Sequence, residues 1–327
     1  MLDNAPEIFE EARLRIQEIK TEIGKVIVGQ NALVDALLIG TFAEGHLLLE
    51  GVPGVAKTLA ANTLAQIINC DFKRIQFTPD LLPADVIGTQ IYNPKDGTFS
   101  IKKGPVFTHV LLADEINRAP PKVQAALLEV MQENQVSIGG ETFKAPSPFL
   151  VVATQNPIEQ EGTYPLSEAQ TDRFMMKVKI DYPSKAEEKM ILEKMGVARS
   201  RPQVNPILGL TEISHFKTLV EQVYIDERVV DYLLNLVFAT RVPETMQFKE
   251  MEGMLEYGAS PRASLALKQA SKARALLYGR YYVIPQDIKE IAPHVLRHRL
   301  RLSYEAEAEN ISSDELINRI LDFIPAP

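Results

Sequence analysis

Short, continuous apolar runs alternate with helical patterns over the first half of the chain. Five runs are predicted to be strands, the last of them partly charged: His46–Glu50, Phe72–Phe77, Val110–Asp114, Phe149–Thr154 and Phe174–Ile180. Helical patterns follow two of these runs, at Thr58–Asn69 and Pro121–Glu133, and another precedes the first run, with Ala12, Ile16, Ile19, Ile23 and Val26 at helical spacing. Continuous apolar runs are typical of parallel strands that are covered on both faces. The alternation therefore predicts a parallel, five-stranded α/β sheet between layers of helices.

Two hairpin signals interrupt this alternation. Asp96-Gly97 and Gly139-Gly140 each lie between short segments with strand character, and both dipeptides supply the positive φ that tight hairpin turns need. Both hairpins contain few large apolar residues, so we expect neither to belong to the central core. They are either plain surface hairpins or projections that contact another molecule.

The composition changes after about Pro183. No further Val/Ile runs appear, and helical patterns dominate: Glu227–Arg241, Pro261–Tyr278, Pro285–Arg299 and Asp314–Ile324. A length of 327 residues favours two domains over one large core. We therefore predict an α/β domain at residues 1–185 and a smaller, all-helical domain at residues 186–327.

A glycine-rich turn, Gly51-Val52-Pro53-Gly54-Val55-Ala56-Lys57-Thr58, links the first apolar run to a predicted helix. Backbone N–H groups of such a loop cradle phosphate oxygens at a helix N-terminus, the lysine reaches the β- and γ-phosphates, and the threonine hydroxyl binds Mg²⁺. Ala56 replaces the usual second glycine, and a methyl group fits there if the residue has helical φ/ψ. The alternative is an ordinary Gly/Pro turn followed by a lysine.

Polar residues end two of the other predicted strands. Asp114 and Glu115 follow one apolar run, and Asn156 follows the next. Asp114 is suited to hold Mg²⁺, and Glu115 to orient and polarise an attacking water. Asn156 would lie at the carboxyl edge of the sheet, where ligands of such sheets bind. The alternatives are surface acids at a strand end and an Asn-Pro turn.

Three arginine-containing segments are also candidates. Arg173 precedes the last predicted strand, remote from the glycine-rich turn, and either serves a neighbouring subunit or pairs with Asp172 or Glu168. Arg262 lies in the first turn of a helix capped by Ser260, where a cation is unfavourable unless an anion binds there. The alternative for Arg262 is exposure to water. The basic run 297–301 is expected to be a solvated helix face.

Charge and cysteine content limit the function classes. The net charge of −8 disfavours broad binding to nucleic acid or anionic membranes. The single cysteine, Cys70, excludes an internal disulfide framework and is typical of a reducing compartment. The chain has no signal-peptide pattern and no apolar run long enough to span a bilayer. We expect a cytoplasmic protein.

These motifs, in this order, resemble the AAA+ ATPases, and most closely the MoxR family in the branch with a helix-2 insert. The resemblance spans nearly the whole chain. It rests on Ile27–Gln30, Gly51–Thr58, Asp114–Pro121, Asn156-Pro157, Glu168–Phe174 and Gly258–Arg262. Ala56 is usual in this family, whereas Ser167 and Thr171 depart from its commoner Pro and Leu.

The resemblance implies a role for each motif. ATP and Mg²⁺ are the implied cofactors, with Thr58 and Asp114 at the metal. Lys57 and Glu115 would act in hydrolysis with Asn156 as sensor 1, Arg262 as sensor 2 and Arg173 as an arginine finger acting in trans. The nucleotide would contact Val28, Gly29, Gln30, Gly51, Pro53, Gly54, Val55, Ala56, Lys57, Thr58 and Leu59.

The resemblance also implies an assembly and a class of partner. The chain would be an Mg-dependent ATPase that forms a hexameric ring and remodels or matures a protein client, with a partner that carries a von Willebrand factor A domain. The hairpins at Asp96-Gly97 and Gly139-Gly140 would be the helix-2 insert and the pre-sensor hairpin, both facing the pore. The helical domain would close Arg262 onto the phosphates. Two alternatives stay open: a DNA-associated motor, and a nucleotide-gated scaffold with slow or no hydrolysis.

Overall fold

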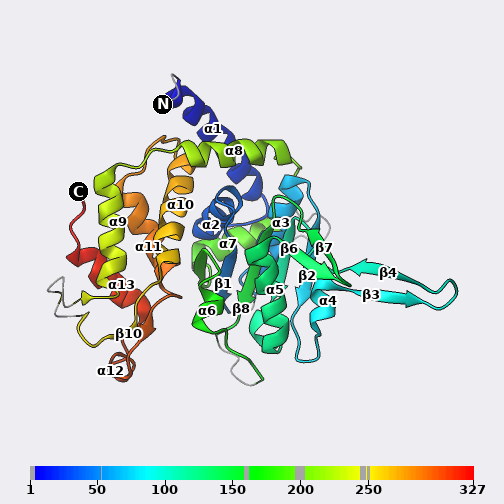
Figure 1. Cartoon of the computed structure of the whole chain (residues 1–327). Helices are drawn as coiled ribbons and strands as arrows, with labels where there is room; N and C mark the ends of the chain where they lie inside the picture. Colours follow the sequence, from blue (N-terminus) through cyan, green and yellow to red (C-terminus); the bar gives the residue numbers. More distant parts are fainter. Residues whose placement is uncertain (1–3, 53, 158–161, 196–202, 244–247, 249–250) are drawn as a thin grey trace.

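The core of the molecule is a five-stranded parallel sheet with strand order β2-β5-β8-β1-β9 (Figure 1). The computed structural model describes residues 4–52, 54–157, 162–195, 203–243, 248 and 251–327. All five predicted strands are confirmed, with ends that move by no more than two residues: β1 (Leu47–Gly51), β2 (Phe72–Gln76), β5 (Val110–Asp114), β8 (Leu150–Gln155) and β9 (Met176–Ile180).

Both faces of the sheet are buried, which explains the continuous apolar runs. Leu47 and Leu49 of β1 face one core and Leu48 faces the other. The first face is covered by α1 (Ala5–Ile23), α2 (Asn31–Phe42) and α3 (Lys57–Ile68). The second is covered by α4 (Pro83–Ile87) and α5 (Pro121–Glu133).

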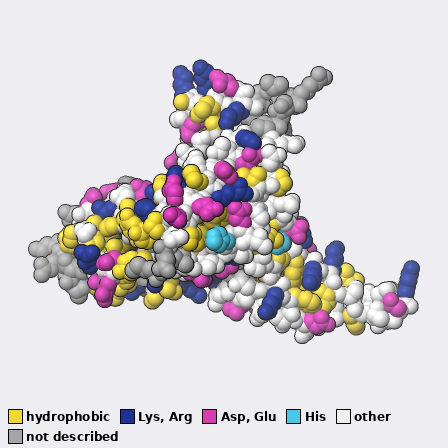
Figure 2. Space-filling view, turned by 90° about the horizontal axis from the view of Figure 1, so that it is seen from above, with side chains coloured by type: hydrophobic (Ala, Val, Ile, Leu, Met, Phe, Trp, Pro, Cys, Tyr) yellow, Lys and Arg dark blue, Asp and Glu magenta, His cyan; other side chains and the backbone are white. Residues whose placement is uncertain are grey.

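The two predicted hairpins are present, but only one of them lies outside the core. Strands β3 (Gly88–Asn93) and β4 (Thr98–Lys103) form an arm that extends away from the sheet (Figures 1 and 2), with Tyr92 and Phe99 exposed and in contact across it. In the second hairpin, β6 (Gln135–Ile138) and β7 (Glu141–Lys144), Val136 and Ile138 are buried in the second core. The expectation that neither hairpin belongs to the core is therefore wrong for the second, because β6 follows α5 directly and turns alternate side chains inward.

The C-terminal part is helical and packs on α1, α2 and the edge strand β9. Its helices are α7 (Lys185–Met195), α8 (Leu210–Gln222), α9 (Glu227–Ala239), α10 (Pro261–Leu277), α11 (Pro285–Leu296), α12 (Tyr304–Ala308) and α13 (Ser313–Phe323). Two short strands, β10 (Leu255–Tyr257) and β11 (Arg301–Leu302), also pair there. Leu267 of α10 and Ile288 of α11 belong to the same core as Leu37 of α2, so the C-terminal helices and the sheet share one hydrophobic interior. Among the described residues, no helix is long and apolar enough to cross a membrane.

A histidine at the start of β1 is buried among backbone groups. The His46 Nε2–H lies 3.0 Å from the Met131 carbonyl oxygen, and Nδ1 accepts from the Val151 N–H at 3.1 Å. The second bond requires the neutral ring, because a protonated Nδ1 cannot accept. Burial therefore lowers the pKa of His46 from 6.5 to about 4, and hydrogen bonding to Met131 only partly opposes this.

This burial predicts a pH-dependent loss of stability. Below pH 6.5 the unfolded chain takes up a proton at His46, whereas the folded chain does not until about pH 4, so the free energy of unfolding falls as the pH drops through this window. We expect His46→Gln to lower stability at pH 7 but to flatten this slope, by up to about 1.4 kcal/mol per pH unit. Urea unfolding at pH 7, 6 and 5 measures both slopes, and equal slopes would contradict the burial of a neutral ring.

Candidate functional site

The glycine-rich turn forms one wall of a cavity at the carboxyl edge of the sheet. We call it the P-loop cavity; its volume is about 350 Å³, and its lining residues are Gly54, Ala56, Lys57, Thr58, Leu59, Asp114, Glu115, Thr154 and Asn156. Strand β1 ends at Gly51, where a Cβ atom would lie 2.5 Å from the Ile180 carbonyl oxygen, so only glycine fits. The structure therefore brings together the three predicted strand-end motifs. Val55 is buried nearby, and Pro53 lies outside the described residues.

Ala56 does not have the backbone conformation that we expected. Its φ of 61° and ψ of 18° are left-handed, and α3 begins only at Lys57. An L-residue other than glycine pays about 1–2 kcal/mol in this region because its Cβ approaches the following carbonyl. The argument that a methyl group is tolerated in helical φ/ψ is therefore wrong, and the loop carries local strain where it faces the cavity.

Asp114 and Glu115 are held by a buried threonine that sequence analysis missed. Thr154 Oγ1 donates to Asp114 Oδ1 at 2.6 Å and accepts from the Glu115 N–H at 2.9 Å. Glu115 itself is left-handed, with φ 55°. The hydroxyl thus fixes the Asp114 carboxylate and the Glu115 backbone at the end of β5. A polar residue ending an otherwise apolar strand was the signal in the sequence.

The same carboxylates receive side chains from β2. Arg74 donates to Asp114 Oδ2 through Nε at 3.0 Å and Nη2 at 2.6 Å, and Gln76 Nε2 donates to Glu115 Oε2 at 2.7 Å. Arg118 Nη1 also lies 3.1 Å from Glu115 Oε2. Sequence analysis missed Arg74 and Gln76 because it did not establish that β2 lies beside β5.

The residues present fit a magnesium ion bound together with phosphate. Thr58 Oγ1 lies 3.5 Å from Asp114 Oδ2, so two hard oxygen donors face the same point. Among the described residues, no group of three or more His, Cys, Asp or Glu side chains could hold a metal alone. Mg²⁺ commonly takes one or two protein oxygens and completes its shell with phosphate and water. The donor set therefore suits a metal that arrives with a nucleotide.

Val28, Gly29 and Gln30 lie between α1 and α2, beside the chain that leaves β9. Gln30 Nε2 donates to the Asp181 carbonyl oxygen at 3.1 Å, and Gly29 is left-handed against Glu187. Because β9 and β1 are neighbouring parallel strands, this loop lies at the same edge as Gly51. The position of this loop is compatible with contact to the nucleobase of a nucleotide whose phosphates lie in the P-loop cavity.

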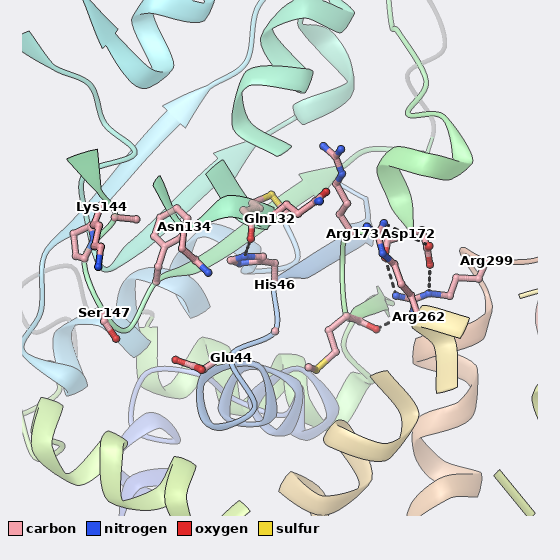
Figure 3. A pocket seen from close by; sticks show the side chains of 16 residues that line it. Glu44, His46, Gln132, Asn134, Lys144, Ser147, Asp172, Arg173, Arg262 and Arg299 are labelled. Carbon is pink, nitrogen blue, oxygen red and sulfur yellow. Dashed lines mark hydrogen bonds and ion pairs between the residues drawn. The ribbon is translucent and has the colours of Figure 1, made fainter. Parts of the chain in front are cut away.

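Arg173 and Arg262 lie in a second cavity, at the opposite edge of the sheet. We call it the arginine cavity; its volume is about 580 Å³. It is lined by residues that precede β1, β8 and β9, including His46, Phe149 and Arg173, and by Arg262 of α10 (Figure 3). A five-residue strand spans about 16 Å, so the length of the sheet separates these arginines from the P-loop cavity of their own chain. Arg262 does not line that cavity.

The carboxylates suggested as partners of Arg173 are bound by other arginines. Asp172 pairs with Arg299 at 2.7 Å and with Arg262 at 3.8 Å, and Glu168 of α6 (Glu168–Thr171) pairs with Arg301. Figure 3 shows Arg262 and Arg299 converging on Asp172, while the Arg173 side chain extends away from them. Within the described part of the chain, the buried Arg173 Nε has no hydrogen-bond acceptor. Arg262 is 48% exposed, so it is paired only in part.

Comparison with known proteins identifies the family of the chain. Residues 46–176 match the ATPase family associated with various cellular activities (AAA), and residues 248–320 match the AAA lid domain. The chain is 52% identical to Chaperone MoxR1 of Mycobacterium tuberculosis over 94% of its own length and 81% of that protein. It belongs to the MoxR family of AAA+ ATPases.

Similarity to two further proteins supports membership of this family. Protein MoxR of Methylorubrum extorquens is 31% identical over 94% of the chain and 93% of that protein. A crystal structure of a provisionally assigned ATPase from Cytophaga hutchinsonii superposes with a TM-score of 0.93 at 49% identity, covering 100% of this chain and 99% of that one. The predicted fold, a P-loop α/β core with a helical lid, is thus confirmed for this MoxR-family chain.

The basic run 297–301 is not the solvated helix face that we expected. His298 and Arg299 are 8% exposed, and Arg297 donates to Asp314 and to the Lys177 carbonyl oxygen. The run follows α11 and packs against the start of β9, where backbone carbonyl oxygens accept its hydrogen bonds. The sequence did not reveal this burial, because a run of basic residues does not show which of them other parts of the fold cover.

The left-handed backbone at Ala56 predicts an unusual response to glycine. Ala56→Gly removes about 1–2 kcal/mol of strain and adds about 0.4–1 kcal/mol of unfolded-state entropy, so we expect stability to be unchanged or raised. The matched control, Ala125→Gly on the exposed face of α5, should lose about 1 kcal/mol. Chemical denaturation compares the two, and an equal loss in both would exclude left-handed geometry at position 56.

The P-loop cavity predicts that binding and hydrolysis separate by residue. Lys57 ends the glycine-rich turn and lines the P-loop cavity. We therefore expect Lys57→Ala to abolish ATP binding. Glu115 lies at the end of β5, where an attacking water must be handled, so Glu115→Gln should keep binding and lose turnover. Fluorescent-nucleotide titration and phosphate release measure the two effects. Unchanged affinity in the first variant, or unchanged turnover in the second, would remove the corresponding assignment.

Proposed function

We propose that this MoxR-family chain hydrolyses ATP with Mg²⁺. The observation that supports this most directly is the convergence of Lys57, Thr58, Asp114, Glu115 and Asn156 on the P-loop cavity. Such cavities bind phosphates through loop N–H groups at the start of a helix, here α3. A bound Mg²⁺ would neutralise phosphate charge from its place beside Thr58 and Asp114.

Each side chain of the cavity has a distinct task in this proposal. Lys57 neutralises the β- and γ-phosphates, and Asn156 binds the γ-phosphate or the attacking water. Glu115 orients and polarises that water and accepts its proton. Gln76 and Arg118 both donate to Glu115 Oε2 in the present structure, which leaves Oε1 to accept a hydrogen bond from the water. Thr154 keeps the backbone of Glu115 in place throughout.

The arginine cavity completes the site of a neighbouring subunit. Arg173 and Arg262 lie at the edge of the sheet opposite to their own P-loop cavity, so neither is placed to contact the phosphates of its own chain. This favours a ring in which one subunit supplies both arginines to the next. The expectation that Arg262 closes onto the phosphates of its own chain is replaced here by a role in trans. Arg173 keeps its role as the arginine finger.

The ring would be hexameric and would remodel a protein client in the cytoplasm, as expected of a chaperone-like MoxR ATPase. The arm β3–β4 carries exposed Ile91, Tyr92 and Phe99 and is suited to contact a client in the pore. A partner with a von Willebrand factor A domain belongs to the same proposal, as does a division of the chain near residue 185. The alternative of a DNA-associated motor is less favoured, because His298 and Arg299 of the basic run 297–301 are buried.

The shared site predicts complementation between inactive variants. Arg173→Ala should bind ATP nearly normally but hydrolyse it on the order of 10³–10⁵ times more slowly, because an arginine finger stabilises transition-state charge. Mixing it with Glu115→Gln places a wild-type Glu115 beside a wild-type Arg173 at some interfaces. Phosphate release should then partly return, and wild-type specific activity should rise with protein concentration.

The control for this experiment mixes each variant with Lys57→Ala, Glu115→Gln double-mutant subunits. These supply an intact Arg173 but no active P-loop, so they should restore activity only to Arg173→Ala. If co-assembly is confirmed by mass, no mixture regains activity, and turnover does not depend on concentration, the role of Arg173 in trans is wrong.

A further inference from the structure

We propose that Asp172 and Arg299 are positioning residues that hold Arg173 and Arg262 in one fixed arrangement. This inference rests on the function proposed above. The structural unit is the Asp172 cluster, which we define as Asp172, Ser260, Arg262 and Arg299. It joins the residues just before β9 to the start of α10 and the end of α11.

Arg299 forms hydrogen bonds to backbone carbonyl oxygens on both sides of Arg173. Its side chain is 3% exposed. Nη2 donates to the carbonyl oxygens of Asp172 at 3.1 Å and of Phe174 at 2.7 Å, and Nη1 donates to that of Met175 at 3.1 Å. Arg299 thus hydrogen-bonds to the backbone before and after Arg173. A planar guanidinium with five donors can satisfy several carbonyls at once, which a lysine cannot.

Asp172 connects the same segment to the helix that carries Arg262. Its Oδ1 accepts from Arg299 Nε at 2.7 Å, and its Oδ2 accepts from Ser260 Oγ at 2.9 Å and lies 3.8 Å from Arg262 Nη1. Ser260 Oγ also accepts from the Arg262 N–H at 3.2 Å, which makes it the N-cap of α10. One carboxylate therefore fixes both the direction of α10 at its first turn and the residue that precedes Arg173.

Charge makes this carboxylate hard to replace. Arg173, Arg262 and Arg299 line one cavity, and burial together with the charge of Arg262 lowers the pKa of Arg299, an effect that Asp172 opposes. Without Asp172, two guanidinium groups of the cluster would lose the carboxylate that they share. Breaking one side of a buried ion pair is more damaging than never forming the pair, because an uncompensated charge stays buried.

Neighbouring contacts make the segment rigid. His298 Nε2 lies 3.1 Å from the Phe174 carbonyl oxygen, and burial lowers the pKa of this histidine well below 6.5, so the neutral ring donates. Thr171 Oγ1 donates to the His298 carbonyl oxygen at 3.2 Å. Because α10, α11 and the start of β9 are linked in this way, any movement of the lid carries Arg173 and Arg262 together. The two arginines reach the neighbouring phosphates as one unit.

The test compares Asp172→Asn and Arg299→Lys with a matched control, Arg297→Lys. Arg297 is in the same run and also bonds to β9, but its hydrogen bonds go to the Lys177 carbonyl oxygen and to Asp314, which are outside the Asp172 cluster. We expect Asp172→Asn and Arg299→Lys to lower kcat on the order of tenfold to a hundredfold, because small displacements of a reacting group have effects of this size. Their own affinity for a fluorescent ATP analogue should stay within about twofold of wild type, as should the kcat of Arg297→Lys.

Complementation distinguishes positioning from a general loss of structure. Mixed with Glu115→Gln, each positioning variant should regain activity as Arg173→Ala does, since the Glu115→Gln subunit supplies an intact arginine pair. Wild-type kcat in both Asp172→Asn and Arg299→Lys, with Arg173→Ala slow, would overturn the inference and leave the proposed function standing. Slow variants that co-assemble but are not rescued would also overturn it. Normal turnover in Arg173→Ala would instead overturn the role in trans that is proposed above for Arg173. If Arg299→Lys fails to fold in thermal unfolding, Asp172→Asn alone decides between these outcomes.

Discussion

The parallel direction of the five strands is the constraint on which the site depends. It brings the ends of β1, β5 and β8 to one edge of the sheet, and with them the phosphate loop, Asp114, Glu115 and Asn156. It also places the starts of β1, β8 and β9 at the other edge, where Arg173 lies. Since the strands are buried on both faces and cannot slide without exposing apolar residues, the two edges keep a fixed separation. Each chain therefore has the P-loop cavity at one edge of the sheet and the arginine cavity at the other.

At each edge, one carboxylate is fixed by partners from several elements. Asp114 is bound by Thr154 of β8 and Arg74 of β2, and Asp172 by Ser260 and Arg299 of the lid. The Asp172–Arg299 pair is the more buried of the two ion pairs, and loss of one partner of a buried pair typically costs about 3–5 kcal/mol, so the geometry of that edge depends on the integrity of the fold. The lid acts through the second carboxylate, because it packs on α1 and α2 rather than over the P-loop cavity.

The sequence was sufficient to predict the features that local pattern controls. Apolar runs located all five strands, and the order of motifs led to the correct family and fold. Features that depend on tertiary neighbours were missed. Arg74 acts on Asp114 only because β2 lies beside β5, and Val136 is buried only because β6 follows α5 into the core. The interpretation of the basic run was wrong because the burial of Arg299 depends on carbonyl oxygens before β9. The left-handed backbone of Ala56 was missed because composition does not reveal strain in a loop.

The most direct test of the shared site is a structure of the Glu115→Gln variant with ATP and Mg²⁺ in its assembled state. Glu115→Gln should trap the nucleotide without hydrolysis. We predict that the guanidinium groups of Arg173 and Arg262 from one subunit lie within hydrogen-bonding distance of the phosphates in the P-loop cavity of the next. In the same structure, Asp172 and Arg299 should keep the contacts that they make here. Arginines that contact the nucleotide of their own chain, or that remain remote from every phosphate, would contradict the account.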